Sequence, residues 1–325
     1  MTQPARLLYV YEERIPVALR DLVRGFLPDA FEVREMTYLT PAEEQKRLLS
    51  WCEVVLFAPG RYLPEDLLEA AKGVKLMQLW SSGYDKFNVA GARRFGIPVA
   101  NNGGANAISV AEHAVLLMQA VNKSLPDSHR RATTGEWAGN LHGLDMFLMY
   151  RKVIGIVGFG KIGRAVARRC GGFETTIIYY DKVRAPADVE AELRARIVDF
   201  DTLLRTADIL TLHLHLNDET RHIIDRHAIA SMKDGAVIIN VSRAQLIERE
   251  ALIEALANGK LRGAGLDVFD VEPTVPGDPL LTLPNVVATH HIAGSTYDTY
   301  AMAIGNCVEN MRRALAGEPV RWLVG

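Results

Sequence analysis

The stretch VIGIVGFGKIGRAVA, residues 153–167, constrains the fold of this chain more than any other. It carries glycines in the spacing G-x-G-x-x-G between an apolar, strand-like run and a helical run. The next apolar run, TIIYYD, ends in an acidic residue, Asp181. The glycine spacing alone is a weak signal. Strand, glycines, helix and acid in this order predict a β-α-β unit of a parallel sheet that binds a dinucleotide.

Each glycine of this loop has its own physical task. Gly158 allows a tight turn, Gly160 lets the backbone approach a pyrophosphate, and Gly163 lets the helix pack close to the strand. The first N–H groups of the helix then face the phosphates. We therefore expect a dinucleotide to be bound by Gly158, Phe159, Gly160, Lys161, Ile162, Gly163 and Asp181.

The residues around position 181 bear on the choice of cofactor. Asp181 would accept hydrogen bonds from ribose hydroxyls and repel a 2′-phosphate, which favours NAD over NADP. Lys182 and Arg184 are close in sequence and weaken that preference. The sequence predicts NAD.

Alternating strand-like and helical runs predict an α/β fold of parallel sheets. In the first hundred residues the strand-like runs are RLLYVY, FEVRE, EVVLF, VKLMQLW and IPVA. A second series begins at residue 152 with KVIGIVG, TTIIYYD, ADILTLHL, GAVIINVS, LRGAGLDVF and NVVATH. Helices are expected at about 109–123, begun by a capping box of Ser109 and Glu112, and at 296–316. The region 124–150 is expected to be irregular.

Composition limits the classes of function. The 325 residues fit two domains, and a net charge of −2 argues against a nucleic-acid partner. No apolar run reaches the ~20 residues of a membrane span, and the N-terminus is typical of a first strand and not of a signal peptide. Three scattered cysteines without CxxC spacing disfavour disulfides and structural zinc. We expect a cytoplasmic protein without a membrane partner.

Polar side chains follow three of the later strands. Arg243 ends IINVSR, Asp267 and Glu272 lie in GLDVFDVEP, and two histidines end VVATHH. The carboxyl ends of parallel strands share one edge of a sheet, where ligands bind. An arginine can grip a carboxylate, a histidine can carry a proton, and a carboxylate can orient that histidine. Such a set could reduce a 2-oxo acid with a nicotinamide cofactor. Adjacent residues on an extended chain point in opposite directions, so only one histidine is expected to face the site.

Across nearly its whole length, the sequence resembles the D-isomer-specific 2-hydroxyacid dehydrogenases. The matching stretches are SSGYDKFNV (81–89), NNGGANAISVAEH (101–113), GFGKIG (158–163), NVSRAQLIEREALIEAL (240–256), GAGLDVFDVEP (263–273) and LPNVVATHHIAGST (283–296). Aligned on Thr289 and on 292–294, the Thr-Pro-His pattern of the family places its proline at His290 and its catalytic histidine at His291.

The resemblance implies a role for each site residue. His291 would be the acid/base, Glu272 would hydrogen-bond it, and Arg243 would bind the substrate carboxylate and polarise its carbonyl. The backbone of Ser82 and Gly83 would hold the other end of that carboxylate. The two remaining residues implied are Asp267, expected to touch the nicotinamide carboxamide, and Asn106, expected in the segment that lines the cleft between domains.

The resemblance also implies the architecture. A Rossmann-type NAD-binding domain, 104–291, is inserted into a flavodoxin-like substrate domain made of 1–103 and 292–325. Family members usually dimerise through the cofactor domain, so a homodimer is expected, with the 109–123 helix and the following arm at its interface.

Several positions depart from the family. His290, His215 and Gly103 stand where prolines are usual, and Arg151 replaces a glycine. The pairs His213/His215 and His290/His291 could suggest a metal site. The dehydrogenase interpretation already uses His291 and needs no metal, so none is expected.

Some alternatives stay open. Arg61, in FAPGRYL, could meet an anionic substrate group or be a solvated loop arginine. Glu272 disfavours a formate dehydrogenase, whose corresponding residue resembles glutamine, but a phosphite- or formate-type dehydrogenase is retained as a hypothesis. So is an NAD-responsive corepressor-like binding protein. The candidate substrates are glyoxylate, hydroxypyruvate, pyruvate, larger 2-oxo acids and 3-phosphohydroxypyruvate.

Overall fold

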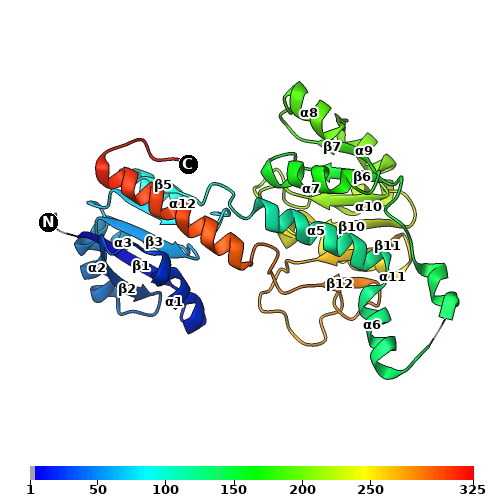
Figure 1. The fold of residues 1–325 in the computed structure, drawn as a ribbon, viewed down its shortest axis with the longest axis horizontal. Helices are drawn as coiled ribbons and strands as arrows, with labels where there is room; N and C mark the ends of the chain where they lie inside the picture. The colour runs from blue at the N-terminus through cyan, green and yellow to red at the C-terminus, as the bar shows by residue number, and fades with distance from the viewer. Residues whose placement is uncertain (1–3, 138) are drawn as a thin grey trace. The chain divides into compact units, whose positions relative to one another are not determined.

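The computed structural model describes residues 4–137 and 139–325, which divide into two compact α/β units (Figure 1). Unit 1 comprises the chain up to Asn106 together with Ser295–Gly325. Unit 2 is the continuous segment Ala107–Gly294. The boundaries expected from the sequence lie three residues earlier, at 103/104 and 291/292. Two parallel-sheet units confirm the predicted fold class.

Unit 1 is built on a five-stranded parallel sheet with strand order β2-β1-β3-β4-β5. Its strands are β1 (Ala5–Tyr11), β2 (Phe31–Thr37), β3 (Val54–Ala58), β4 (Leu76–Leu79) and β5 (Val99–Ala100). Its helices are α1 (Val17–Phe26), α2 (Ala42–Trp51), α3 (Glu65–Ala70), α4 (Val89–Arg94) and α12 (Tyr297–Ala316). Residues alternate along β1: Leu7 and Tyr9 pack toward α1 and α12, whereas Leu8 and Val10 pack toward α2 and α3. Both faces of the sheet are thereby covered.

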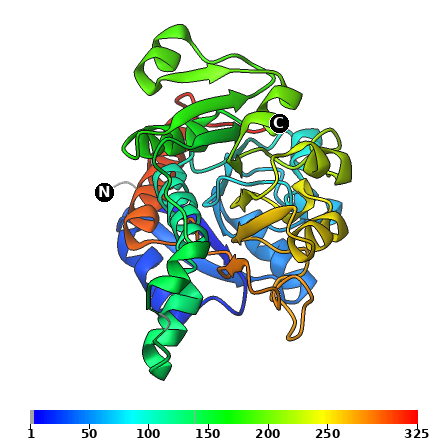
Figure 2. The same cartoon turned by 90° about the vertical axis from the view of Figure 1, so that its right-hand side faces the viewer.

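Unit 2 contains a seven-stranded parallel sheet of order β12-β11-β10-β9-β6-β7-β8. Its strands are β6 (Val153–Val157), β7 (Thr176–Tyr180), β8 (Ala195–Ile197), β9 (Ile209–Leu212), β10 (Ala236–Asn240), β11 (Leu261–Leu266) and β12 (Val286–Ala288). Its helices are α5 (Ala107–Asn122), α6 (Leu125–Thr134), α7 (Lys161–Gly171), α8 (Ala187–Leu193), α9 (Phe200–Thr206), α10 (Arg226–Ser231) and α11 (Arg249–Ala257), with 3-10 turns η1 (Gly139–Asp145) and η2 (Ala244–Leu246). Seen from its end, α5 lies on one face of this sheet and α10 and α11 on the other (Figure 2).

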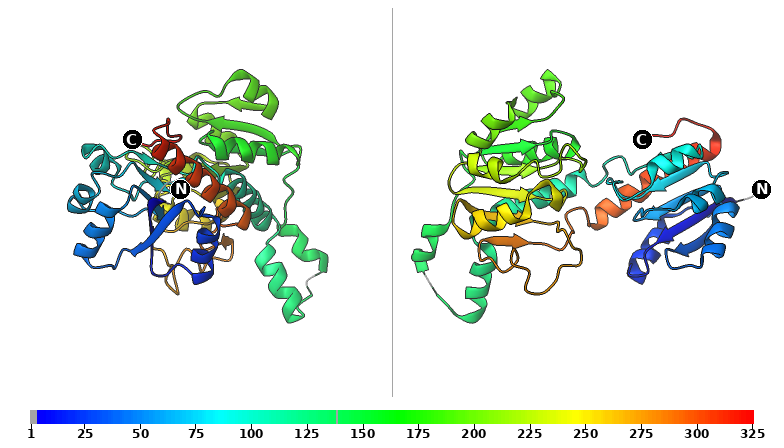
Figure 3. Two further views of the ribbon diagram at one scale, coloured as in Figure 1. Left: turned by 60° about the vertical axis from the view of Figure 1, so that its left-hand side comes forward. Right: turned by 180° about the vertical axis from the view of Figure 1, so that it is seen from behind.

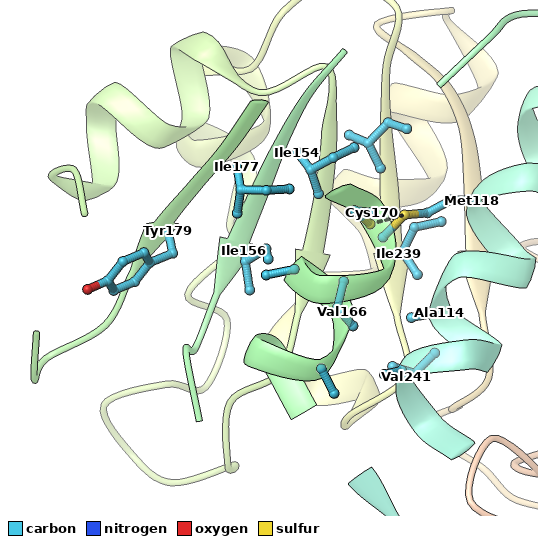
Figure 4. Packing of buried hydrophobic residues seen from close by; sticks show 14 of the residues in the cluster. Ala114, Met118, Ile154, Ile156, Val166, Cys170, Ile177, Tyr179, Ile239 and Val241 are labelled. Atoms are coloured by element: carbon cyan, nitrogen blue, oxygen red, sulfur yellow. Dashed lines mark hydrogen bonds between the residues drawn. The ribbon is translucent and has the colours of Figure 1, made fainter. Parts of the chain in front are cut away.

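The core between the unit 2 sheet and helices α5 and α7 fixes the start of the glycine loop (Figure 4). Ile154 and Ile156 of β6 are fully buried there, beside Val166 of α7 and Met118 of α5. Glycines make this close packing possible. A Cβ at Gly265 of β11 would come within 2.9 Å of Leu117 Cβ in α5. The core therefore holds strand, loop and helix in one fixed relation.

The structure corrects three local expectations. Helix α5 begins at Ala107, and Ser109 does not cap it: its Oγ donates to the carbonyl oxygen of Ala293 at 2.7 Å. The region 124–150 is not wholly irregular, since it contains α6 and η1, which project from unit 2 (Figure 3). The short strand β8 was also missed by the sequence analysis.

Candidate functional site

The glycine loop has the steric properties that its spacing predicts. Gly158 has φ +93°, and a Cβ there would lie 2.7 Å from the carbonyl oxygen of His213. A Cβ at Gly163 would lie 2.2 Å from the carbonyl oxygen of Gly158, a distance no real Cβ contact shows. At Gly160 a Cβ would meet nothing within 4 Å. Two glycines are therefore required by the fold, whereas Gly160 faces open space that a bound group can fill.

The start of α7 offers backbone donors to that space. Gly160 is its N-cap residue, and no side chain caps the helix. The first N–H groups of an α-helix lack partners within the helix and attract anions. The open space at Gly160 and the uncapped start of α7 thus fit the pyrophosphate of a dinucleotide.

Two other members of the loop serve its structure. The Phe159 ring is 2% exposed and stacks on Tyr179, with ring centroids 3.9 Å apart, so its side chain packs in the core. Its N–H donates to Oδ2 of Asp181 at 2.7 Å. Ile162 is half-buried against the core, and Lys161 is exposed at the first position of α7. Asp181 therefore ties the glycine loop to β7 and remains partly accessible.

The two basic residues that follow Asp181 are engaged by carboxylates. Arg184 donates to Oε2 of Glu190 at 2.8 Å, and this contact lowers the pKa of Glu190. Lys182 pairs with Glu219, which lowers the pKa of that carboxyl too. Because each cation already has an anionic partner, neither is poised for a 2′-phosphate. The geometry strengthens the preference for NAD.

A second polar group lies after β11 and β12. Nδ1 of His291 is 2.9 Å from Oε2 of Glu272, the contact that the resemblance implied. Oε1 of Glu272 accepts the N–H of Phe269 at 3.1 Å. The His291 and Glu272 side chains are 47% and 28% exposed. When Nδ1 donates to Glu272, the other ring nitrogen, Nε2, is the one that can exchange a proton with a substrate.

His291 has an unusual backbone conformation, which a buried carboxylate stabilises. Its φ is +58°, in the left-handed region that costs a non-glycine residue free energy. Asp267, 1% exposed, accepts the next two N–H groups, those of Ile292 at 2.9 Å and Ala293 at 2.8 Å. Thr289 Oγ1 also donates to Asp267, at 2.6 Å. Asp267 thus holds the loop from both sides of His291, and its contact with a nicotinamide stays a prediction.

Two further histidines lie near these loops and stay neutral. Nε2 of His113, on α5, is 2.8 Å from Oγ1 of Thr289, and burial lowers its pKa although Asp267 opposes the shift. Burial lowers the pKa of His213 to about 3. The His213 ring contacts Thr211 Oγ1 through Nε2 at 2.9 Å, and its Nδ1 is a buried nitrogen without a hydrogen-bond partner. Neither ring is suited to carry a proton near neutral pH.

The remaining predicted residues lie after strands of both sheets. Arg243 follows β10, at the same sheet edge as Glu272 and His291, and donates to the carbonyl oxygen of Ser242 at 2.8 Å. In unit 1, Ser82 follows β4, and its Oγ is 2.6 Å from Oδ1 of Asn106. Gly83 accepts a hydrogen bond from Ser81 Oγ at 2.8 Å. The predicted pair Ser82 and Asn106 is therefore brought together.

The structure bears on two of the departures from the family and explains the first. Gly103 has φ +69°, which proline cannot adopt, and a Cβ there would lie 2.4 Å from the Trp322 ring. Arg151 adopts φ +57°, the conformation for which a glycine is better suited. His215 and His290 are exposed. Among the described residues, no three His, Cys, Asp or Glu side chains are placed to hold a metal ion.

Comparison with known proteins decides the family. Residues 115–293 match the model of the D-isomer specific 2-hydroxyacid dehydrogenase, NAD binding domain. The chain belongs to this family. It is 40% identical over 259 residues to a hydroxypyruvate reductase of Thermotoga maritima, covering 78% of this chain and 82% of that protein. It is 34% identical to a D-3-phosphoglycerate dehydrogenase of Archaeoglobus fulgidus over 86% of this chain, and it spans about half of that protein, 52%.

Solved structures agree with that assignment. The holo form of D-mandelate dehydrogenase from Rhodotorula graminis superimposes with a TM-score of 0.87 at 27% identity, over 99% of this chain and 98% of that one. NAD is therefore the cofactor of this dehydrogenase fold. No helix in the described residues is long and apolar enough to cross a membrane.

Proposed function

We propose that this protein interconverts a 2-oxo acid and the corresponding D-2-hydroxy acid with NADH, using His291 as the acid/base. The observation that carries the proposal is the 2.9 Å contact between His291 and Glu272 on a loop fixed by Asp267. A carboxylate beside an imidazole orients the ring and favours its protonated form.

The residues divide the work of the reduction among them. When bound, NADH supplies the hydride that reaches C2 of the substrate. Protonated His291 donates a proton from Nε2 to the carbonyl oxygen, and Glu272 stabilises the cation until then. Arg243 binds the substrate carboxylate and polarises the carbonyl, because a guanidinium can donate two parallel hydrogen bonds. Ser82, Gly83 and Asn106 complete the proposed contacts with the carboxylate. The reverse reaction uses neutral His291 as the base.

In the cofactor part of the proposal, unit 2 is the NAD-binding domain and unit 1 the substrate domain. Gly160 and the first N–H groups of α7 would hold the pyrophosphate, and Asp181 would accept a ribose hydroxyl. We expect NADPH to be the poorer cofactor because Asp181 repels a 2′-phosphate while Lys182 and Arg184 are already paired.

The first experiment is NADH oxidation with a panel of 2-oxo acids that includes glyoxylate, hydroxypyruvate, pyruvate and 2-oxo dicarboxylic acids, with NADPH as a matched control. We expect turnover with NADH and a D-configured product by chiral chromatography. NAD-dependent oxidation of phosphite or formate, with an inactive 2-oxo acid panel, would favour the alternative dehydrogenase. An inactive panel with NADH still bound, together with capture of a partner only in NADH, would favour the corepressor-like alternative.

We also propose a homodimer formed through the arm, meaning α6 and η1. None of the residues of these two elements is buried, and Leu141 and Leu144 are 75% and 77% exposed. The base of the arm is anchored, because Arg262 lies over the Phe147 ring at 3.8 Å. Exposed apolar side chains on an anchored projection are typical of an interface. Light scattering should show a dimer, and a double variant Leu141→Asp/Leu144→Asp a monomer. A monomeric wild type would refute the proposal.

A further inference from the structure

The sheet of unit 1 has a topological switch point between β1 and β3. From β1 the chain passes to β2 on one side and then returns to β3 on the other, as the strand order β2-β1-β3-β4-β5 records. In open α/β sheets, a crevice outside the carboxyl ends of the strands forms at such a point, and ligands bind there. The side chains that follow β1 and β3 therefore bear on what unit 1 can accept.

A salt bridge joins the two strand ends at this point. Glu12 follows β1 and Arg61 follows β3, and Oε1 of Glu12 accepts from both Nε and a terminal nitrogen of Arg61. The other oxygen of Glu12 pairs with Arg14. The Glu12 side chain is only 13% exposed and that of Arg61 is 33% exposed. This pair is therefore shielded more than an ordinary surface salt bridge, which contributes little because water screens it.

The backbone of Arg61 is held in place from the end of β2. Tyr38 Oη donates to the carbonyl oxygen of Pro59 at 2.8 Å and accepts the N–H of Arg61 at 3.0 Å. Burial raises the pKa of Tyr38, so its hydroxyl keeps its proton. The ends of β2 and β1 thus hold the backbone and the guanidinium of Arg61, which follows β3.

Within unit 1, Arg61 follows the strand next to the one that leads to the proposed substrate contacts. Strand β3 pairs with β4, and β4 leads into Ser82 and Gly83. Neighbouring strands lie about 4.8 Å apart. A 2-oxo acid whose carboxylate is bound at the Ser82 loop therefore reaches the loop after β3 with the far end of a short side chain.

We propose that the Glu12–Arg61 pair makes this enzyme selective for 2-oxo acids whose far end is uncharged, by keeping Arg61 from binding a second anion. The inference rests on the proposed function and names its substrate class. A second carboxylate or a phosphate that pairs with Arg61 must share its guanidinium with Glu12, whose negative charge repels it. The charges beyond β1 and β3 are otherwise balanced, because Glu13 adds a second carboxylate and Arg14 a second guanidinium. Glu12 is thus the specificity-determining residue.

The test compares kcat/KM for oxaloacetate and 2-oxoglutarate with kcat/KM for pyruvate and hydroxypyruvate. Wild type is expected to favour the monocarboxylic acids. Glu12→Gln removes the competing carboxylate and should raise the dicarboxylate-to-monocarboxylate ratio at least about tenfold, a change of about 1.4 kcal/mol. The double variant Glu12→Gln/Arg61→Gln should lose that gain.

Glu13→Gln is the matched control, because it changes net charge equally while the Glu13 side chain bonds Thr37 and, at 2.8 Å, the N–H of Leu39 at the end of β2. The dicarboxylate-to-monocarboxylate ratio of Glu13→Gln should equal that of wild type. An equal rise in this ratio in Glu12→Gln and Glu13→Gln would overturn the proposal, because net charge alone would then explain it. An unchanged ratio in Glu12→Gln, or a wild type that prefers dicarboxylic acids, would also overturn it. If Glu12→Gln fails to fold, the charge-neutral double variant decides: its ratio should equal that of wild type, and a ratio about tenfold lower would overturn the proposal by showing that Arg61 already binds a second anion in wild type. A wild type inactive with every 2-oxo acid would instead refute the proposed function.

Discussion

The glycine loop (158–163) and the loop that carries His291 (289–293, here the histidine loop) lie at the same edge of the unit 2 sheet but are held in different ways. The glycine loop is fixed by backbone sterics: Gly158 and Gly163 are in contact with carbonyl oxygens that leave no room for a side chain. The histidine loop is fixed by one buried carboxylate, Asp267, which accepts hydrogen bonds from both sides of His291. The first arrangement suits a ligand that is recognised by backbone N–H groups. The second suits a side chain that must be oriented accurately enough to form a hydrogen bond.

The histidines beside the two loops also differ. His213, whose carbonyl oxygen lies against Gly158, is neutral, with a buried ring nitrogen. His291 is half-exposed and has a carboxylate partner. A histidine packed for structure and the histidine that we propose to transfer a proton therefore lie at one edge of the same sheet. The comparison teaches that exposure and partner, and not residue type, separate the two roles.

The largest effect should come from removing the imidazole of His291. His291→Ala is expected to lower kcat about a thousandfold, because a positioned acid/base contributes 10²–10⁴-fold. NADH affinity, measured by fluorescence titration, should change by less than about threefold, since the glycine loop is untouched. His290→Ala is the control and should retain most activity. Wild-type rates in His291→Ala would show that the histidine loop takes no part in the reaction.

A second prediction tests the steric half of the comparison. Gly163→Ala places a methyl group against the carbonyl oxygen of Gly158, so the free energy of unfolding should fall by about 3 kcal/mol. In Gly160→Ala the methyl group meets no protein atom within 4 Å. Its stability in urea titrations should change by less than about 0.5 kcal/mol, while NADH binding weakens about tenfold. Equal stability of the two variants would contradict the packing described here.

The glycine loop shows what a local sequence pattern can predict. Its turn, its helix start and the position of Asp181 all follow from residues within 30 positions, and the structure contains them. The failures have local causes too. Ser109 has capping-box spacing, yet its hydroxyl donates to Ala293, 184 residues away, and the helix begins earlier. Propensity cannot foresee such a tertiary competitor.

The histidine loop shows where sequence patterns stop. Its residues were found by their positions after strands and by resemblance, but the arrangement that holds them was not. His113 and Thr289 are 176 residues apart, and no spacing rule links them. The sequence also gave no sign that Asp267 is buried and accepts three hydrogen bonds that hold the loop. Burial depends on the complete fold and cannot be read from one strand.

A third prediction weakens the carboxylate that holds the histidine loop. Asp267→Asn replaces one accepting oxygen by an amide that must face an N–H or O–H donor. The free energy of unfolding should fall by about 2 kcal/mol, because a buried hydrogen bond to a charged group is lost. kcat should fall with it, as His291 loses its left-handed backbone conformation. Asp270→Asn, 38% exposed, is the matched control and should be neutral in both assays. A fully active, stable Asp267→Asn would show that the histidine loop keeps its conformation without the Asp267 carboxylate.

The smallest effect concerns the structural histidine and depends on pH. The unfolded chain protonates His213 near pH 6.5, whereas burial keeps the folded pKa at about 3. Between these values the unfolded state binds the extra proton, so stability is lost as pH falls below 6.5, by up to ~1.4 kcal/mol per pH unit. In urea titrations at pH 7, 6 and 5, the free energy of unfolding of wild type should fall more than that of His213→Leu below pH 6.5. His215→Leu, at an exposed position, should follow the wild type. If the His213→Leu and wild-type curves stay parallel, His213 is accessible to protons, and the division between a packed and a presented histidine fails.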